Sequence, residues 1–323
     1  MEFASTLISN LQTPMFLAFF LGIFATLIKS DLKFPDGMYV GLTIYLLLAI
    51  GMKGGVKLSQ TPLETFYKPA SAAIYLCIMI PVVAYFILTK IGKYDSINSA
   101  AIAAHYGSVS AVTFSEALAF LDTLQISYEG FMPSLLAIME IPAILVALFL
   151  VKAKTKSDDG SWKKILHELF AGKGTVLLIG GLLIGIISGK KGETQFAPLF
   201  DVPFRGVLIL FLLEVGLVTG RRLSDLKKAG PFLVLFGIFF PIMNAVIGIL
   251  LGKLAGLSLG GSVILGTLSG SASYIAAPSA VRIALPEASP AYYLTASLAI
   301  TFPFHLSLGI PMYLVIAKNI YGV

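Results

Sequence analysis

The chain has 323 residues, of which 57% are hydrophobic and 12% charged, with a formal net charge of +6 and a mean hydropathy of +0.90. Such a composition leaves too few polar side chains to cover a soluble domain, so most of the surface is expected to face lipid. The basic residues are spread through short connections between apolar runs, which indicates membrane topology and argues against nucleic-acid binding. The single cysteine, Cys77, excludes an intrachain disulfide and a Cys-rich metal site.

Ten apolar runs are candidates for helices that cross the hydrocarbon core of a bilayer, which takes about 17 to 25 residues each. The segment from Met1 to Pro14 lacks the basic start of a cleavable signal, so the first run is expected to remain as a helix. In chain order the runs are residues 15–28, 38–58, 69–88, 97–121, 131–151, 174–188, 203–223, 231–251, 259–285 and 292–317.

Features of the first five runs recur in the last five, in the same order and at separations of 160 to 165 residues. Such regular internal similarity indicates a structural repeat. Because each half has an odd number of crossings, the second half must enter the membrane from the opposite side, as in the inverted repeats of secondary transporters. The matched residues are Gly51 with Gly216, Pro81 with Pro241, Gly107 with Gly270, and Pro142 with Pro303.

The prediction is therefore an all-α integral membrane protein of ten transmembrane helices, built as two inverted five-helix repeats. The first repeat is residues 1–152, a cytoplasmic linker is 153–173, and the second repeat is 174–323. With the N-terminus outside, 15 of the 23 Lys and Arg residues fall in inside connections, so both termini are expected outside. The Lys-rich part of the linker is interpreted as a topology determinant that keeps this connection on the cytoplasmic side. The alternative is a docking site for a regulatory protein.

Small hydroxyl residues interrupt the fourth and ninth runs at matching places. Serine and glycine weaken helix propensity, and non-helical backbone survives in a membrane only where it lines a cavity or is buried in protein. We expect two broken helices whose ends meet near the bilayer midplane, where N-terminal N–H groups suit a small anion and C-terminal carbonyls suit Na⁺. The residues expected to bind the anion are Gly107, Ser108, Ser110, Gly270, Ser271 and Ser273.

Small residues can instead serve close helix packing. That is the preferred interpretation of the glycines in the sixth run, which are Gly180, Gly181, Gly185 and Gly189.

Three acids lie inside apolar runs, where a lone charge costs several kcal/mol unless it is paired, hydrated or neutralised. Glu116 and Glu140 are candidate cation ligands, whereas Glu214 could pair with basic residues nearby. His105 and His305 could relay protons, although a hydrogen-bonded core role is preferred for both.

No enzyme motif is found: there is no metal-ligand spacing, nucleophile elbow or Walker motif, and no cofactor is expected beyond a coupling ion. A permease served by separate ATPase subunits stays open as an alternative. A channel would need a continuous polar stripe, which the sequence lacks.

Five segments resemble the sodium-dependent bicarbonate transporters of cyanobacteria and their wider bacterial family. The similarity extends over nearly the whole chain and is most specific in residues 107–118, 126–129, 139–143, 273–282 and 288–292. The resemblance implies a homotrimeric Na⁺-coupled bicarbonate symporter of the bacterial inner membrane. Its first, second, sixth and seventh helices would form a gate, and the other six a core that moves like an elevator.

Two departures from the family pattern stand out. Cyanobacterial members carry an acid at the position of Tyr274, and the central linker, where a PII-like regulatory protein would bind in that family, is short here.

We expect the small anion to be bicarbonate and the coupling ion to be sodium. One alternative is a proton- or sodium-coupled carrier of another small anion that uses Glu116 or His105. The other is a membrane sensor that binds the ion without transporting it. The candidate sodium ligands are Thr113, Glu116, Glu140, Ser269 and Tyr274.

Overall fold

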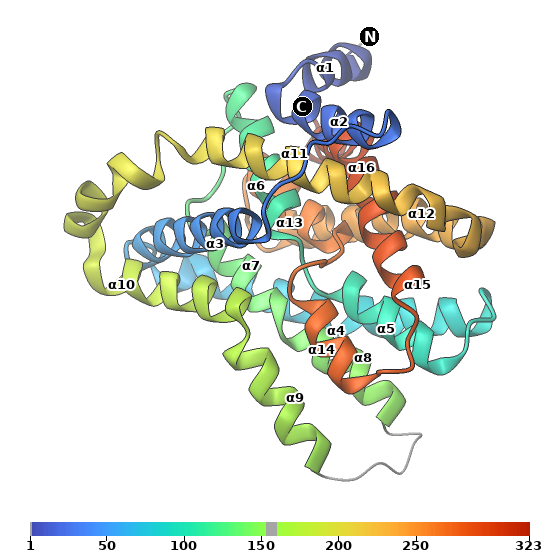
Figure 1. The fold of residues 1–323 in the computed structure, drawn as a ribbon. Helices are drawn as coiled ribbons and strands as arrows, with labels where there is room; N and C mark the ends of the chain where they lie inside the picture. Colours follow the sequence, from blue (N-terminus) through green and yellow to red (C-terminus); the bar gives the residue numbers. More distant parts are fainter. Residues whose placement is uncertain (1, 153–159) are drawn as a thin grey trace.

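The computed structural model describes residues 2–152 and 160–323, and both ranges are helical, with no strand in either (Figure 1). The predicted all-α class is confirmed. The first half contains α1 (Glu2–Leu11), α2 (Pro14–Leu27), α3 (Asp36–Ser59), α4 (Leu63–Lys90), α5 (Ser96–Gly107), α6 (Ala111–Thr123), α7 (Met132–Glu140) and α8 (Pro142–Lys152). Part of the predicted linker, residues 153–159, lies outside the described residues.

The second half begins with α9, which forms the rest of the predicted linker. Its helices are α9 (Gly160–Ala171), α10 (Lys173–Phe200), α11 (Phe204–Arg222), α12 (Leu226–Leu254), α13 (Leu259–Gly270), α14 (Ala277–Ala284), α15 (Pro290–Leu294), α16 (Phe302–Phe304) and α17 (Ile310–Tyr321). A 3₁₀ turn at Leu223–Asp225 joins α11 to α12, and π-helical turns at Thr295–Thr301 and His305–Gly309 flank α16.

Six helical stretches in the described part of the chain are long and apolar enough to cross a bilayer. One of them, Phe204–Leu254, contains both α11 and α12, and two shorter apolar helices are α2 and α13. The protein is therefore a multi-pass membrane protein. The other five stretches are Gly37–Ser59, Leu63–Lys90, Met132–Val151, Lys173–Phe200 and Pro290–Tyr321.

Helices α1 and α10 are among those that differ from the sequence prediction. α1 precedes the first apolar run, where no helix was expected. α10 continues to Phe200, well past the predicted end at residue 188, because polar residues such as Lys190 and Lys191 lower the hydropathy without stopping a helix. At Gly189 the backbone takes φ 55° and bends this helix, a conformation that glycine adopts without steric cost.

Two pairs of helices pack closely through glycines, α3 with α10 and α2 with α11 (Figure 1). A Cβ atom added at Gly55 would overlap the carbonyl oxygen of Leu182 in α10, and one at Gly216 would overlap that of Phe19 in α2. Small residues at these positions let the helix backbones touch, as in other membrane helix pairs.

The packing role predicted for the α10 glycines holds for Gly181 and Gly185, whose added Cβ atoms would press on the backbone of α3. The prediction was wrong for Gly180, which has no atom within 4 Å of such a Cβ, and for Gly189, which supplies the bend instead.

Residues that match between the two halves also make equivalent contacts. A Cβ at Gly107 would lie 2.8 Å from the ring of Pro81, and a Cβ at Gly270 would lie 2.8 Å from the carbonyl oxygen of Pro241. The glycine that ends each broken segment therefore packs on the matching proline-containing helix of its own half, α4 or α12.

Asp95 caps the N-terminus of α5. Its carboxylate accepts hydrogen bonds from the backbone N–H of Ile97 at 3.0 Å and of Asn98 at 2.9 Å, and from Asn98 Nδ2 at 2.6 Å. Partial burial opposes ionisation, but these hydrogen bonds outweigh it and lower the pKa of Asp95 below its usual value.

Replacing Asp95 by Ala should lower the free energy of unfolding by about 1 kcal/mol, the usual cost of losing such a cap. Because the folded pKa is depressed, this stabilisation is complete above the unfolded pKa of about 4 and is lost as the pH falls through the folded pKa. Thermal unfolding of the wild type and Asp95→Ala should therefore differ most near neutral pH and converge in acid. An equal difference at every pH would contradict the capping role.

Candidate functional site

The helical backbone is interrupted between α5 and α6. α5 ends at Gly107, and Ser108 (φ −84°, ψ 166°) and Ser110 (φ −107°, ψ 111°) are extended before α6 begins at Ala111. Ser110 caps α6, since its Oγ accepts hydrogen bonds from Thr113 N at 3.2 Å and Thr113 Oγ1 at 3.0 Å. Gly107, Ser108, Ser110 and Thr113 are buried, and Ala111 is partly buried.

A second interruption separates α13 from α14. α13 ends at Gly270, Ser271 is extended (φ −76°, ψ 163°), and α14 begins only at Ala277. Ser273 Oγ accepts a hydrogen bond from Ala277 N at 3.3 Å, so a serine again holds the start of the following helix. We refer to residues 108–110 and 271–276 together as the double break.

The two interruptions are hydrogen-bonded to each other. Ser110 N donates to Ser271 Oγ at 3.0 Å, and Ser273 N donates to the carbonyl oxygen of His105 at 2.7 Å. Serines that the sequence matched across 163 residues thus lie together in the buried centre of the protein. The contacts are not symmetric, because Ser108 Oγ donates instead to the carbonyl oxygen of Glu140 at 2.9 Å.

The first turn of α6 presents free donors at the double break. Thr113 N is capped by Ser110, and Phe114 N donates to Ser110 O at 2.9 Å, which leaves Ala111 and Val112 N–H without an acceptor in the described residues. Apolar atoms of both residues border a void of about 10 Å³ that also touches Ile275. That volume holds about one water molecule, so a larger ligand needs this region to open.

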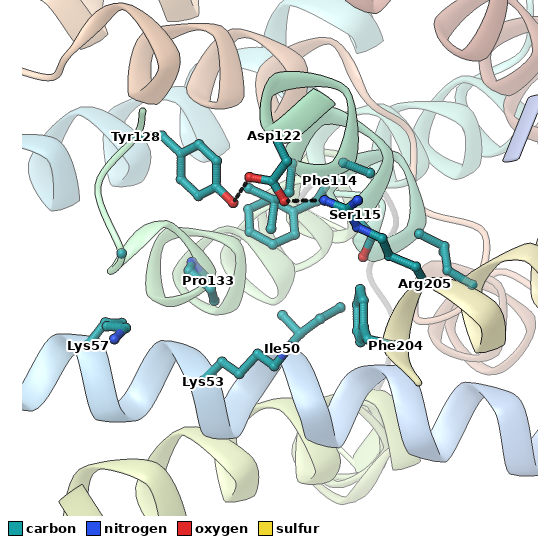
Figure 2. Close-up of a pocket in the computed structure, with 14 residues that line it drawn as sticks. Ile50, Lys53, Lys57, Phe114, Ser115, Asp122, Tyr128, Pro133, Phe204 and Arg205 are labelled. Carbon is teal, nitrogen blue, oxygen red and sulfur yellow. Dashed lines mark hydrogen bonds and ion pairs between the residues drawn. The ribbon is translucent and has the colours of Figure 1, made fainter. Parts of the chain in front are cut away.

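Two larger cavities extend from this region along the face of α3. The Asp122 vestibule, about 220 Å³, reaches Ser115 of α6 (Figure 2). The α9 cavity, about 560 Å³, reaches Tyr274 and Ile275 and is bordered by His167 of α9 and by Arg282. Helices α3, α10 and α11 form one wall of these spaces, and α6 with residues 274–279 forms the other.

Charged side chains ring the Asp122 vestibule. Figure 2 shows the Asp122 carboxylate between Arg205 and Tyr128, with Lys53 and Lys57 on α3 across the cavity. Arg205 Nη2 lies 3.2 Å from Asp122 Oδ2, and the Tyr128 hydroxyl donates to Asp122 Oδ1 at 2.9 Å. Burial, followed by the Asp122 charge, raises the pKa of Tyr128, so this phenol stays protonated and donates.

The two candidate acids lie in different surroundings. Glu116 is 6% exposed, its Oε1 has no hydrogen-bond partner among the described residues, and it lies near Tyr274. Glu140 is 7% exposed, and its Oε1 would lie 3.2 Å from a Cβ added at Gly174, the second residue of α10. Its Oε2 makes no hydrogen bond within the described part of the chain.

The other predicted sodium ligands are also spread out. Thr113 lies beside Ser110, and the Tyr274 hydroxyl approaches Ser110 and Glu116 without a well-formed hydrogen bond in the described residues. Ser269 faces α12, where its Oγ contacts Gly248, and it donates to Leu265 O at 2.7 Å. The structure thus joins Thr113 and Tyr274 to the double break but directs the Ser269 hydroxyl away from it.

Three further titratable residues of the core, Glu214, His305 and His105, differ in how completely they are paired. Glu214 pairs with Arg221 at 3.8 Å, as the sequence suggested. His305 is fully bonded, to Thr301 O at 2.9 Å and to the Tyr313 hydroxyl at 2.9 Å. His105 bonds Ala101 O at 2.7 Å through Nδ1, but its Nε2 has no partner in the described residues.

Sequence reasoning missed the ion pair of Asp122 and Arg205. Asp122 follows the end of the fourth apolar run and Arg205 lies near the start of the seventh, positions where a charge indicates only topology, and nothing in their spacing of 83 positions indicates contact. Only the packing of α6 against α11 brings them together.

Comparison with curated proteins returned no match. Over residues 14–318, nearly the whole chain, the sequence matches the Na⁺-dependent bicarbonate transporter superfamily, and the protein belongs to that superfamily.

Proposed function

We propose that this protein takes up bicarbonate with sodium as the coupling ion, by an elevator-like alternating-access mechanism. The observation that carries the proposal is the double break, two buried non-helical segments hydrogen-bonded to each other between four helix ends. In a membrane protein such backbone is tolerated where it lines a substrate site, and interrupted helices are where secondary transporters bind their ions.

The double break supplies what a small oxyanion needs. The free N–H groups of Ala111 and Val112 sit at the N-terminus of α6, whose dipole favours negative charge. The proposed anion site consists of these groups with the predicted residues Gly107, Ser108, Ser110, Gly270, Ser271 and Ser273. Because the adjoining void is only about 10 Å³, bicarbonate enters when the site opens toward one of the larger cavities.

Sodium is assigned to oxygen atoms around the double break. The candidate ligands are Thr113, Glu116, Glu140 and Tyr274, together with nearby carbonyls such as that of Glu140, whereas the predicted ligand Ser269 would have to turn its hydroxyl from α12 to take part. A cation there offsets the charge of the anion, so each ion raises the affinity for the other. Sodium moving down its gradient then drives bicarbonate uptake.

The packing supports a division into a gate (α2, α3, α10 and α11) and a core (α4 to α8 and α12 to α17). Within the gate, glycines hold α3 to α10 and α2 to α11. Between gate and core the contacts are largely apolar, for example Phe19 and Phe211 on one side and Val112 and Phe302 on the other. Apolar contacts have no fixed direction, so the core can slide along the gate.

The equivalent contacts of Gly107 and Gly270 support two inverted repeats of five crossings. We propose further that the protein is a homotrimer in a bacterial inner membrane with both termini outside, and that the linker is the site for any PII-like regulator.

A proton-coupled carrier of another small anion is the second candidate. It is favoured by Glu116 Oε1 and His105 Nε2, two buried titratable atoms that have no hydrogen-bond partner in the described residues.

The test is uptake of labelled bicarbonate into sealed vesicles that contain the purified protein, at alkaline pH where little of the label is CO₂. An inward sodium gradient should accelerate uptake strongly over potassium. Equal uptake with both ions rejects sodium coupling, acceleration by a proton gradient instead favours the second candidate, and binding without net flux identifies a sensor.

A further inference from the structure

Glu116 is a buried acid that the packing leaves without a counter-charge. Its side chain is 6% exposed, and Oε1 has no hydrogen-bond donor among the described residues. A carboxylate in such a place is stable only when a cation or a proton neutralises it. The carboxylate therefore needs a ligand that the protein itself does not provide.

Glu116 lines a cavity of about 320 Å³ beneath α1, which we call the α1 cavity. The cavity lies between the turn that joins α1 to α2 and one face of α6, on which Glu116 and Thr123 are two turns apart. Its polar lining residues are Ser9, Asn10, Gln12, Thr13, Glu116, Thr123 and Arg205.

Three polar residues of the α1 cavity, besides Glu116, have oxygen atoms that can act as acceptors. Thr13 Oγ1 donates to Asn10 O at 2.9 Å, and Thr123 Oγ1 donates to Ala119 O at 2.8 Å, so each hydroxyl hydrogen is already used. The Asn10 amide nitrogen donates to Leu306 O at 2.6 Å, which leaves its oxygen to accept. Oxygen lone pairs beside a carboxylate are the ligands that hard cations such as Na⁺ prefer.

Arg205 is the one basic side chain on the described lining of the α1 cavity, and its charge is already paired with an acid other than Glu116. Its guanidinium pairs with Asp122 at 3.2 Å, on the face of α6 that borders the Asp122 vestibule (Figure 2). That vestibule also carries Lys53 and Lys57, which pair with Asp201 at 2.6 Å and with Glu193 at 3.1 Å. α6 thus presents Asp122, paired with Arg205, toward the vestibule and the carboxylate of Glu116, unpaired among the described residues, toward the α1 cavity.

We infer that Glu116 is the carboxylate ligand of the coupling sodium ion, and that sodium reaches it through the α1 cavity. The inference rests on the proposed function and names the route and principal ligand of its cation. Glu116 lies near Tyr274, the residue that follows Ser273 in the double break. A sodium ion bound at Glu116 can therefore influence the proposed anion site through the side chain of Tyr274.

The test measures sodium binding without bicarbonate and without flux. The full-length protein is titrated with NaCl at constant ionic strength, with choline chloride as the balance, and its thermal unfolding temperature is followed. Glu116→Gln should raise the half-saturating sodium concentration at least tenfold, and Glu116→Asp should restore part of the loss. Glu64→Gln, an exposed acid in the first turn of α4, is the matched control and should leave the titration unchanged.

If the unfolding temperature of Glu116→Gln depends on sodium as that of the wild type does, the inference is overturned. It is also overturned if the unfolding temperature of the wild type changes with pH but not with sodium, because Glu116 would then be a proton site. If Glu116→Gln does not fold, Glu116→Asp takes its place, because its shorter side chain should weaken sodium binding about threefold, and an unchanged titration overturns the inference. Because no bicarbonate is present, failure of bicarbonate transport in vesicles would count against the proposed function and leave this result standing.

Discussion

Replacement of Ser110 by Ala is expected to slow bicarbonate uptake by roughly 10- to 100-fold. A hydrogen bond to a charged group contributes about 1.5–3 kcal/mol, and 1.4 kcal/mol corresponds to a factor of ten. The same change removes the cap on Thr113, which costs about 1 kcal/mol and loosens the first turn of α6 where the anion donors lie. Ser110 therefore combines a ligand role with the shaping of the site.

The initial rate of labelled bicarbonate uptake, at equal amounts of protein in the vesicles, measures this effect. Ser99→Ala is the control, because Ser99 is also a buried serine in the α5–α6 pair but bonds Tyr94 O at the far end of α5. Its uptake should stay close to the wild type. An active Ser110→Ala protein with a normal bicarbonate dependence would exclude Ser110 from the site.

Replacement of Gly185 by Ala should disrupt the contact between α3 and α10. The added Cβ would overlap the carbonyl oxygen of Met52 and lie 2.9 Å from Val56 N, and both are backbone atoms that cannot turn aside. Overpacking of this kind costs about 1–3 kcal/mol and sometimes more. We expect a lower thermal unfolding temperature and weak transport, because both helices belong to the proposed gate.

Gly180→Ala is the matched control for Gly185→Ala. It makes the same substitution in the same helix, but nothing lies within 4 Å of its added Cβ. Alanine favours a helix over glycine, so Gly180→Ala should equal or slightly exceed the wild type in stability. Equal stability of the two variants would contradict the close packing of α3 and α10.

The double break was predictable because hydroxyl residues recur at one spacing in a chain that otherwise repeats apolar runs. The sequence matched Ser110 with Ser273, which lie in the two segments that bond each other, and Gly107 with Gly270, which end the helices before them. The packing role of Gly181 and Gly185 was also predictable, because small residues in membrane helices let helix backbones approach each other.

What the sequence could not supply is the direction of each side chain around a helix. Glu116 and Glu140 were equivalent as acids in apolar runs, yet one lines the α1 cavity and the other approaches the start of α10. Ser269 shares the serine pattern of α13 but bonds within its own helix, toward α12. Such differences depend on which neighbours surround a helix, and a single helix does not encode them.

The most direct test of the account is the affinity for labelled bicarbonate, measured at zero and at saturating sodium in the wild type and in the Ser110→Ala, Ser271→Ala double variant. The account predicts that sodium tightens bicarbonate binding in the wild type and that the double variant binds no bicarbonate at either concentration. Binding that is indifferent to sodium and survives the loss of both serines would contradict it.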